Sequence, residues 1–379
     1  MKQIKIVTVV GTRPEIIRLS SVINRLNAST FIDHTLIHTG QNYDKNLNDV
    51  FFNDLEIKKP DFYLDAAMGN PNQTIGEILI KIDPLLEEIN PDAMLILGDT
   101  NSCLSAIAAK KKKIPIFHFE AGNRCFDFRV PEEANRRLVD HISDINLTYS
   151  SNASNNLINE GLPSDRIIKV GSPMYEVISK NMDKIKNSKV LNKLDLEKEK
   201  YFLISCHREE NIDNINNFNK LIQSLNSITD FYNLPIIFPV HPRTKKIIDK
   251  NKPKLNNLVK LIEPLGFIDY NQLQINSNVV LSDSGTISEE SSILNFRAIN
   301  IRETHERHEA MEESSVIMTG LDSTRIIQGI EALKDQKTSS ERNIYQVSDY
   351  KVPNVSIKIE RIILSYINYI NRVVWQKES

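Results

Sequence analysis

The sequence IPIFHFEAGNRCFDFRVPEEANRRLVDH, residues 114–141, gives the strongest indication of the chain's architecture. Its apolar run 114–119 predicts a buried strand, and the pattern from Pro131 onward predicts a helix that begins near that proline. Carboxylates, arginines and a glycine therefore follow the C-terminal end of a strand. In open α/β sheets, ligands bind in the crevice outside these strand ends. The alternative is an ordinary loop with a solvated charged face.

Strand and helix patterns alternate on both sides of this stretch. Further strands are expected at 4–10, 33–40, 93–97, 145–149, 167–170, 201–205, 235–239, 258–262, 279–281 and 298–301. Helical patterns lie between them, at 16–26, 73–89, 102–112 and 215–228. This alternation is typical of an α/β fold, with parallel sheets covered by helices on both faces.

The length of 379 residues favours two domains over one. The polar, lysine-rich stretch 181–200 is typical of an interdomain connection. We therefore expect two Rossmann-like, doubly wound domains that face each other across a cleft, at 1–175 and 176–354. The tail 355–379 has apolar residues at helical spacing up to about residue 373. It is expected to pack back on the first domain, although an independent helix is also compatible with the pattern.

The composition, 40% hydrophobic and 25% charged, is that of a globular protein. Acids (49) and bases (47) nearly cancel to a formal charge of -2, so no excess of positive charge is available for a nucleic-acid backbone. The chain shows no signal-peptide pattern and no apolar run long enough to cross a bilayer. We expect a cytosolic protein without membrane or nucleic-acid partners.

Three cysteines, Cys103, Cys125 and Cys206, are too few and too scattered for a disulfide framework or a zinc site. All three are expected to be free thiols. Cys125 lies within the stretch quoted above, but a nucleophilic role would require an activating base beside it.

A second candidate site follows the strand expected at 279–281. Ser284, Gly285 and Thr286 open a helix that carries Glu289 and Glu290. Backbone N–H groups at a helix N-terminus, together with hydroxyls, bind a diphosphate well, and an acid one turn later suits a ribose diol. The alternative is a plain helix cap with solvated carboxylates. Neither a Walker loop nor a full GxGxxG motif is present, which weakens triphosphatase and dinucleotide oxidoreductase interpretations.

Ionisable residues recur in or just after the turns that end the expected strands. In the first half they are Arg13, Arg18, Asp99, Glu120 and Glu132, and in the second half His207 and His241. Converging acids and a histidine are what proton abstraction from carbon and departure of a leaving group require. A lone histidine is more often structural, and residues 110–113, all lysines, predict only a solvated helix end.

An ordered set of short motifs covers nearly the whole chain. They are GTRPE (11–15), HTGQ (38–41), GDT (98–100), EAG (120–122), PEEANR (131–136), GSP (171–173), HR (207–208), HP (241–242) and SDSG (282–285). Together they resemble the non-hydrolysing UDP-N-acetylglucosamine 2-epimerase family, whose members have the GT-B arrangement of two Rossmann-like domains.

The resemblance implies inversion at C2 of a UDP-2-acetamido sugar without a redox cofactor or a metal. The C2 proton is removed with anti loss of UDP from C1, which gives a 2-acetamidoglycal. UDP then adds back while a proton reaches the other face of C2. The resemblance also suggests a homodimer.

The same resemblance assigns roles to individual positions. Acid/base and charge-stabilising work is implied for Asp99, Glu120, Glu132 and His207. Substrate or UDP binding is implied for Arg13, Arg18, Arg136, His241, Ser284, Gly285, Thr286 and Glu290, the last of these at the ribose. Position 18 is usually lysine in the family. The sequence leaves open which carboxylate is the C2 base, because its pKa depends on burial.

Two departures bear on the substrate. The loop between Gly122 and Pro131 is shorter than in enzymes acting on UDP-N-acetylglucosamine, and it begins Asn-Arg rather than Leu-Arg. In this it is similar to the subgroup that makes UDP-N-acetyl-L-fucosamine from UDP-2-acetamido-2,6-dideoxy-L-talose for surface polysaccharides such as capsule or O-antigen. His308 stands where the family usually has proline. The alternatives are a UDP-N-acetylglucosamine 2-epimerase, a GT-B glycosyltransferase or a nucleotide-sugar binding module.

Overall fold

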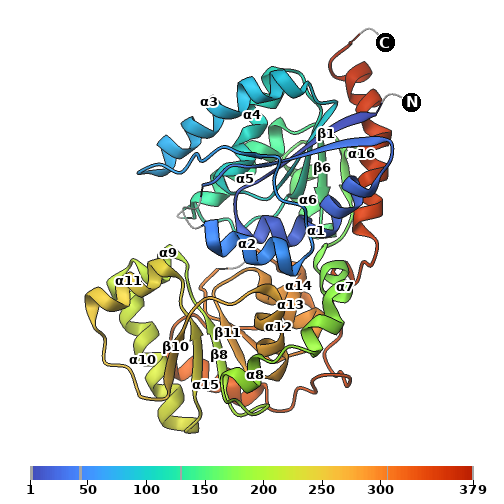
Figure 1. Cartoon of the computed structure of the whole chain (residues 1–379). Coiled ribbons are helices and arrows are strands. Elements are labelled where there is room, and N and C mark those ends of the chain that lie inside the picture. Colours follow the sequence, from blue (N-terminus) through green and yellow to red (C-terminus); the bar gives the residue numbers. More distant parts are fainter. Residues whose placement is uncertain (1–2, 42–44, 129, 305, 378–379) are drawn as a thin grey trace. The chain divides into compact units, whose positions relative to one another are not determined.

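A computed structural model describes residues 3–41, 45–128, 130–304 and 306–377. The chain divides into two compact units, shown in Figure 1. Unit 1 comprises Met1–Lys180 together with Lys351–Ser379, and unit 2 comprises Asn181–Tyr350. Within the described residues, no helix has the length and apolar character needed to span a membrane.

In the described part of unit 1, parallel strands form a sheet in the order β3-β2-β1-β4-β5-β6-β7. The strands are β1 (Ile4–Val10), β2 (Ile32–His38), β3 (Phe62–Tyr63), β4 (Ala93–Leu97), β5 (Ile116–Ala121), β6 (Ile145–Thr148) and β7 (Ile167–Lys169). Every residue of β4, β5 and β6 is buried. Nearly continuous apolar runs of this kind are expected where helices cover both faces of a sheet.

Helices connect these strands and cover the sheet. They are α1 (Arg13–Ala28), α2 (Lys45–Asp54), α3 (Pro71–Ile89), α4 (Ala106–Lys111), α5 (Pro131–Ile142), α6 (Ser151–Asn159), α7 (Met174–Lys186, which crosses into unit 2) and α16 (Val355–Val373), with short 3-10 turns at Asn101–Ser105 and Ser164–Arg166. One core joins the sheet to α3, α4 and α5 and includes Val9, Ile82, Met94 and Val139.

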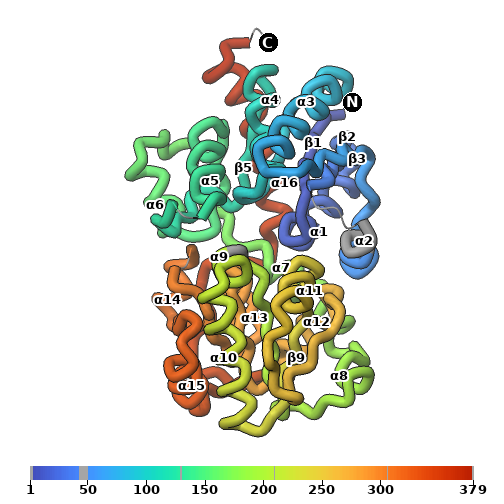
Figure 2. Tube along the Cα trace, turned by 90° about the vertical axis from the view of Figure 1, so that its left-hand side faces the viewer, coloured from blue at the N-terminus to red at the C-terminus, as the bar shows by residue number. Residues whose placement is uncertain are grey.

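The C-terminal helix α16 packs beside α1 in unit 1. Figure 2 shows its trace passing behind β1 and β5. Glu360, which is buried, accepts a hydrogen bond from Arg25 Nε at 2.7 Å, and Lys358 Nζ donates to the carbonyl of Val170 at 2.6 Å. Side-chain contacts along α16 therefore join it to α1 and to the chain after β7.

Of the lysines at 110–113, Lys111 and Lys113 are exposed, as expected of a solvated helix end, but Lys110 and Lys112 form ion pairs, which corrects part of the interpretation from sequence. Lys110 Nζ pairs with the buried carboxylate of Asp144 at 2.6 Å and lies 4.8 Å from the centre of the Trp375 ring. Lys112 pairs with two carboxylates of α3. The lysine run therefore connects α4 to β6 and to the chain after α16.

In the described part of unit 2, parallel strands form a second sheet in the order β10-β9-β8-β11-β12-β13. The strands are β8 (Phe202–Ser205), β9 (Ile236–Pro239), β10 (Val259–Ile262), β11 (Val280–Ser282), β12 (Ala298–Asn300) and β13 (Ile317–Met318). The helices are α8 (Val190–Lys193), α9 (Glu209–Ile212), α10 (Ile215–Tyr232), α11 (Pro242–Asn251), α12 (Phe267–Asn276), α13 (Thr286–Leu294), α14 (His308–Glu312) and α15 (Ser323–Ala332), with a 3-10 turn at Ser348–Tyr350.

The main core of unit 2 lies between this sheet and helices α10 and α15, which run side by side in Figure 2. Ile204 and Phe238 from the strands pack with Leu221, Leu225 and Ile330 from the helices. The two parallel sheets, each covered by helices, confirm the predicted α/β class with two Rossmann-like units.

The polar stretch 181–200 belongs to unit 2 and is partly helical, since it contains the end of α7 and all of α8. Ser188 Oγ donates to Asp269 Oδ1 on α12 at 2.5 Å, which ties this stretch to its unit. The chain passes between the units after Lys180 and after Tyr350, whereas the sequence suggests residues 175 and 354.

Candidate active site

Each sheet has one place where the strand order reverses, and most of the predicted site residues lie there. In unit 1 the reversal is between β1 and β4, and in unit 2 it is between β8 and β11. The crevice at the carboxyl ends of such strands is where open α/β sheets bind ligands. Arg13 and Asp99 follow β1 and β4, while His207 and Ser284 follow β8 and β11.

Glu15, on the first turn of α1, joins the two turns at the unit 1 reversal. Its Oε2 accepts hydrogen bonds from the backbone N–H groups of Gly11 and Thr12, both at 2.7 Å, and its Oε1 accepts one from Thr100 Oγ1 at 2.7 Å. Burial raises the pKa of Glu15 to about 7, although the hydrogen bonds from Thr100, Gly11 and Thr12 favour the ionised form. The sequence shows Glu15 within the GTRPE motif but does not reveal this role.

A glycine is required in the first of these turns. A Cβ atom on Gly11 would lie 1.9 Å from Ser102 Oγ and 2.2 Å from Thr39 Oγ1. Those hydroxyls are hydrogen-bonded to each other at 2.8 Å. The close approach of the β1 turn to the residues after β2 and β4 therefore depends on the missing side chain.

Glu120 occupies an irregular position at the end of β5. The pairing of β5 with β6 shifts register between Phe119 and Ala121, and Glu120 between them has φ +68. A bulge with a left-handed residue that is not glycine is uncommon and re-aims a side chain. The carboxylate is 8% exposed, forms an ion pair with Arg18, and accepts from Tyr149 Oη at 3.1 Å. The structure thus brings the predicted residues Arg18 and Glu120 together.

Two other residues predicted for the site, Asp99 after β4 and Arg136 on α5, form an ion pair. Arg136 is 1% exposed, and its other terminal nitrogen donates to Glu133 Oε2 at 2.8 Å. Asn135 Nδ2 also donates to the carbonyl of Asp99 at 3.0 Å. The first half of α5 therefore holds the turn that carries Asp99.

Of the two adjacent carboxylates on α5, Glu133 is buried and Glu132 is half-buried. Glu133 accepts hydrogen bonds from Arg136, from Arg137 Nε at 3.1 Å and from the Cys125 thiol at 3.3 Å. Because Glu133 already holds two guanidinium groups, the geometry gives it the role of an anchor for the loop before α5.

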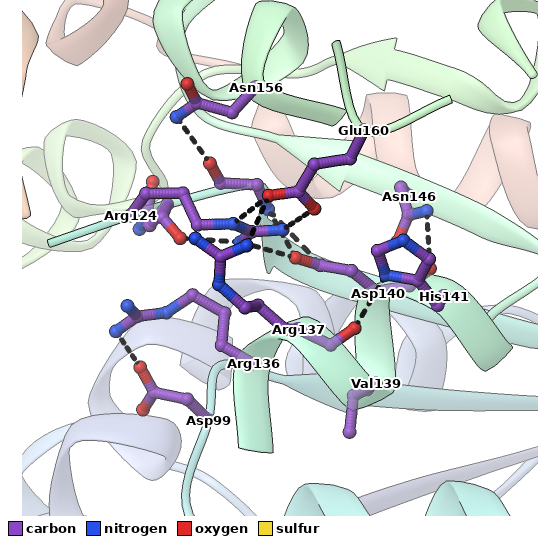
Figure 3. A network of polar contacts seen from close by, with 12 residues as sticks. Asp99, Arg124, Arg136, Arg137, Val139, Asp140, His141, Asn146, Asn156 and Glu160 are labelled. Atoms are coloured by element: carbon purple, nitrogen blue, oxygen red, sulfur yellow. Dashed lines mark hydrogen bonds and ion pairs between the residues drawn. The ribbon is translucent and has the colours of Figure 1, made fainter. Parts of the chain in front are cut away.

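The loop after Glu120 is held by a buried charged network that the sequence does not reveal (Figure 3). Arg124 makes a bidentate pair with Glu160 of α6, at 2.8 and 2.6 Å, and donates to Asp140 Oδ2 of α5 at 2.7 Å. Arg137 adds a bond to Glu160 at 3.0 Å. His118 of β5 completes the set, with Nδ1 2.9 Å from Asp140 Oδ1.

This network lowers the pKa of two of its carboxylates, Asp140 and Glu160. Burial raises the pKa of Asp140, but His118 and Arg124 more than offset this and hold it below its ordinary value. The hydrogen bond from Arg124 likewise lowers the pKa of Glu160. The loop that begins at Gly122 is thereby anchored to both α5 and α6.

Gly122 itself has φ +80, and a Cβ there would lie 2.3 Å from the carbonyl oxygen of Ala153. Asp140 accepts from its backbone N–H at 3.2 Å, and Asn156 donates to its carbonyl at 3.0 Å. The EAG motif therefore combines a bulge, a glycine that permits close packing, and the start of the anchored loop.

In unit 2, Asp283 occupies the position at which the strand order reverses. It is completely buried, and its carboxylate accepts from the backbone N–H groups of His207, at 3.1 Å, and Arg208, at 3.0 Å. The Cys206 thiol donates to it at 3.1 Å. Burial, reinforced by Asp283, raises the pKa of Cys206 well above its ordinary value, so this thiol stays protonated. The sequence shows Asp283 only as part of SDSG.

The predicted diphosphate-binding residues open α13. Ser284 Oγ lies 3.0 Å from Thr286 Oγ1 and accepts from the Thr286 N–H at 3.3 Å. Gly285 is the helix cap, and a Cβ on it would meet no atom within 4 Å. One helical turn later, Glu290 is 8% exposed and accepts from Gln274 Nε2 at 2.6 Å. Ser284, Gly285, Thr286 and Glu290 therefore belong to one short segment.

Arg13, His241 and His308, which the sequence also singles out, each lie at the start of a helix. Arg13 is the first residue of α1, with its guanidinium carbon 5.9 Å from the centre of the Phe51 ring. His241 caps α11, and its Nδ1 accepts from the Arg243 N–H at 3.3 Å. His308 is the first residue of α14, a position at which proline is also favoured. Either residue is therefore compatible with this helix start.

All three cysteines are free and buried, as predicted. Among the residues that the structure describes, no group of three or more histidines, cysteines and acids is arranged to hold a metal ion.

Sequence comparison relates the chain to known proteins over most of its length. Residues 24–364 match the family described as UDP-N-acetylglucosamine 2-epimerase. The UDP-N-acetylglucosamine 2-epimerase of Methanococcus maripaludis is 40% identical, over 87% of this chain and 91% of its own. The UDP-2,3-diacetamido-2,3-dideoxy-D-glucuronate 2-epimerase of Pseudomonas aeruginosa is 31% identical, over 90% and 95%.

Comparison with solved structures finds the same family. UDP-N-acetylglucosamine 2-epimerase from Rickettsia bellii superposes with a TM-score of 0.91, at 47% identity and over 99% of this chain and 100% of the other. The Methanocaldococcus jannaschii enzyme in complex with UDP-GlcNAc and UDP gives 0.89, at 34% identity over 96% and 100%. The galactosyltransferase WaaB, at 14% identity and a TM-score of 0.51 over 94% and 100%, shares only the GT-B-like fold. The chain therefore belongs to the UDP-N-acetylglucosamine 2-epimerase family and is a non-hydrolysing UDP-sugar 2-epimerase.

Proposed function

We propose that the enzyme inverts C2 of UDP-2-acetamido-2,6-dideoxy-L-talose and so forms UDP-N-acetyl-L-fucosamine. A base takes the proton from C2 while the C1–O bond breaks and its electron pair leaves with UDP. The products of this anti elimination are a 2-acetamidoglycal and UDP. Addition of UDP to C1, with a proton delivered to the opposite face of C2, completes the inversion. No electron is gained or lost overall, so the reaction requires no redox cofactor.

Asp99, Glu120, Glu132 and His207 are the proposed acid/base and charge-stabilising residues. Support for Glu120 comes from its position in a bulge beside Arg18, because a side chain re-aimed in this way is typical of functional sites. Asp99 is supported by its place at the strand-order reversal and by its pair with Arg136.

The proposed UDP site is the start of α13. Ser284, Gly285 and Thr286 would present hydroxyl and N–H donors to the diphosphate, and Glu290 would accept from the ribose diol. We also propose that the side chains of Arg13 and His241 contact the diphosphate.

Arg18 and Arg136 already hold Glu120 and Asp99, and both arginines are buried. We therefore propose that these two guanidinium groups act on the bound substrate by placing the carboxylates and balancing their charge. Their effect on UDP affinity should then be smaller than that of Thr286 or Glu290.

The choice of the 6-deoxy sugar rests on one feature, the short loop between Gly122 and Pro131. Arg124, near its start, is fixed to Asp140 and Glu160, and Cys125 is fixed to Glu133. The short loop that resembles the L-fucosamine subgroup is therefore held in place by side chains of unit 1. A second candidate substrate is UDP-N-acetylglucosamine, which is favoured by the names of the relatives from Methanococcus and Rickettsia.

The two candidate substrates can be distinguished by NMR. The purified protein is incubated with each UDP sugar in deuterium oxide, and the exchange of the C2 proton is followed. Deuterium at C2 with the 6-deoxy-talo sugar, faster than with UDP-N-acetylglucosamine, supports the proposal. Faster exchange with UDP-N-acetylglucosamine would transfer the assignment to the manno product. A transferase would release UDP without placing deuterium at C2.

A role in the synthesis of a surface polysaccharide, a location in the cytosol and a homodimeric state remain predictions from the sequence. Light scattering coupled to size exclusion tests the last of them, and a monomer mass would contradict it.

A further inference from the structure

We infer that Asp283 is a positioning residue that holds the turn carrying His207 in its working conformation. The inference rests on the proposed function, because it assumes that His207 acts on the substrate. Asp283 lies directly after β11 and His207 lies directly beyond the end of β8, so the two turns flank the strand-order reversal of unit 2.

The carboxylate of Asp283 accepts hydrogen bonds from three consecutive residues of the turn after β8. Oδ2 accepts from the Cys206 thiol at 3.1 Å, from the His207 N–H at 3.1 Å and from the Arg208 N–H at 3.0 Å. It also accepts from Asn211 Nδ2, on α9, at 3.2 Å. Four donors from one short segment therefore converge on a single buried oxygen.

The main chain of Asp283 adds to this attachment. Its N–H donates to the carbonyl of Ser205 at 3.1 Å, and its carbonyl accepts from Arg208 Nε at 3.1 Å. The turn after β8 is thus held from both sides of one residue. A buried carboxylate is costly unless it is hydrogen-bonded, and here the compensating donors are the backbone of the turn itself.

The imidazole of His207 shows why this attachment matters for chemistry. Its side chain is 47% exposed, and Nδ1 lies 3.6 Å from Asp283 Oδ1. The ring therefore extends from an anchored backbone into accessible space, with one edge toward the carboxylate. A general acid or base must be held within hydrogen-bonding reach of its proton, and a small displacement sharply reduces the rate.

The UDP segment is attached differently. Ser284 and Thr286 bond to each other and to the backbone of their own turn, and Glu290 bonds to Gln274. None of these contacts uses the Asp283 carboxylate. Replacing that carboxylate should consequently impair the step in which His207 takes part more than it impairs UDP binding.

A double-mutant cycle tests the inference with kcat, KM and C2 deuterium exchange as readouts. Asp283→Asn should lower kcat by about 100-fold and change KM by less than about threefold. In the His207→Asn background the same substitution should cost less than about threefold, because the group it positions is already gone. Asp144→Asn is the matched control: Asp144 is also buried and accepts a backbone N–H, from Ile116 at 2.9 Å, but it lies at the amino end of β6.

Equal losses of kcat from Asp283→Asn in both backgrounds, or no loss in the wild-type background, would overturn the inference. Absence of C2 exchange in the wild-type enzyme would instead overturn the proposed function, so the two failures are distinguishable. If Asp283→Asn does not fold, hydrogen exchange of the wild-type enzyme supplies the test. The amides of His207 and Arg208 should be protected, and exchange at the rate of an unstructured peptide would refute their capture by Asp283.

Discussion

Each unit has a buried carboxylate beside its strand-order reversal, but the two carboxylates follow different strands and hold different groups. Glu15 of unit 1 lies on the helix after the first strand and bonds across to the Thr100 hydroxyl after β4. Asp283 of unit 2 lies after the later strand, β11, and bonds back to the backbone amides after β8. Both join the two turns at the strand-order reversal, and they do so in opposite directions along the chain.

The surroundings of the two positions differ as well. Unit 1 adds two arginine–carboxylate pairs, Arg18 with Glu120 and Arg136 with Asp99. Unit 2 offers the start of a helix with hydroxyls at Ser284 and Thr286. The first set of groups suits proton transfer and changes of charge, and the second suits a diphosphate. We therefore expect unit 1 to supply the carboxylates of the chemical step, and unit 2 to supply His207 together with most of the groups that bind the nucleotide.

The substitution Glu120→Gln should have the largest effect, and it tests whether unit 1 supplies a carboxylate to the chemical step. Loss of the carboxylate should lower kcat by about 1000-fold while UDP affinity, measured by calorimetry, stays within about twofold. Glu77→Gln, which changes a partly exposed carboxylate on α3, serves as the control. Full activity of Glu120→Gln would remove Glu120 from the catalytic set and with it the main support for the role of unit 1.

A second test concerns the stability of unit 1. Arg124→Met removes the buried guanidinium that Asp140 and Glu160 share and should lower the free energy of unfolding by about 3 kcal/mol. Arg137→Met is the control, because Arg137 also contacts Glu160 but is 29% exposed, and its other carboxylate, Glu133, keeps its pair with Arg136; its loss should cost less than about 1 kcal/mol. Urea denaturation measures both. Equal losses would show that the buried network does not anchor the loop.

A third and smaller effect is expected in unit 2. Glu290→Gln removes the proposed charged acceptor of the ribose diol and should weaken UDP binding by about tenfold, with kcat nearly unchanged. Glu331→Gln, on the exposed side of α15, is the control. A fall in kcat without a change in UDP affinity would place Glu290 in the chemical step and blur the contrast between the units.

A further effect concerns the pH dependence of stability, to which Glu15 and Asp140 of unit 1 contribute in opposite directions. The pKa of Glu15 is raised from 4.5 to about 7, so the folded state binds this proton more tightly than the unfolded state does. Its contribution to stability is complete below the unfolded pKa and is lost as the pH rises toward 7, by at most about 1.4 kcal/mol per pH unit.

Glu15→Gln should remove this part of the pH dependence, which denaturation curves between pH 4.5 and 7.5 would measure. Asp140, whose pKa is lowered, contributes in the opposite direction: its stabilisation is present at neutral pH and is lost on acidification. An identical slope for the wild-type and Glu15→Gln proteins would show that Glu15 does not titrate in this range.

Much of this arrangement follows from local sequence. The apolar runs and the glycine turns predict the strands and place Asp99, Glu120, His207 and Ser284 at their carboxyl ends, where the structure has them. The observed strand orders then bring Asp99, His207 and Ser284 to the reversals, and the right-handed rule for parallel connections limits the orders that are possible.

The charged partners could not be predicted in this way. Arg124 and Glu160 are separated by 36 residues, and only the packing of α6 on the sheet brings them together. Glu132 and Glu133 are neighbours in sequence, and the turn of α5 decides which one is buried. The raised pKa of Glu15 likewise depends on burial, which no local pattern reports.

The central claim is that the C1–O bond and the C2–H bond both break and form again on this enzyme. The most direct test uses the 6-deoxy-talo UDP sugar with a heavy-oxygen label in the bridge between C1 and phosphorus, incubated in deuterium oxide. We expect deuterium at C2 together with movement of the label from the bridge into the non-bridging positions of the β-phosphate. Epimerisation with protium kept at C2 and the label kept in the bridge would contradict it.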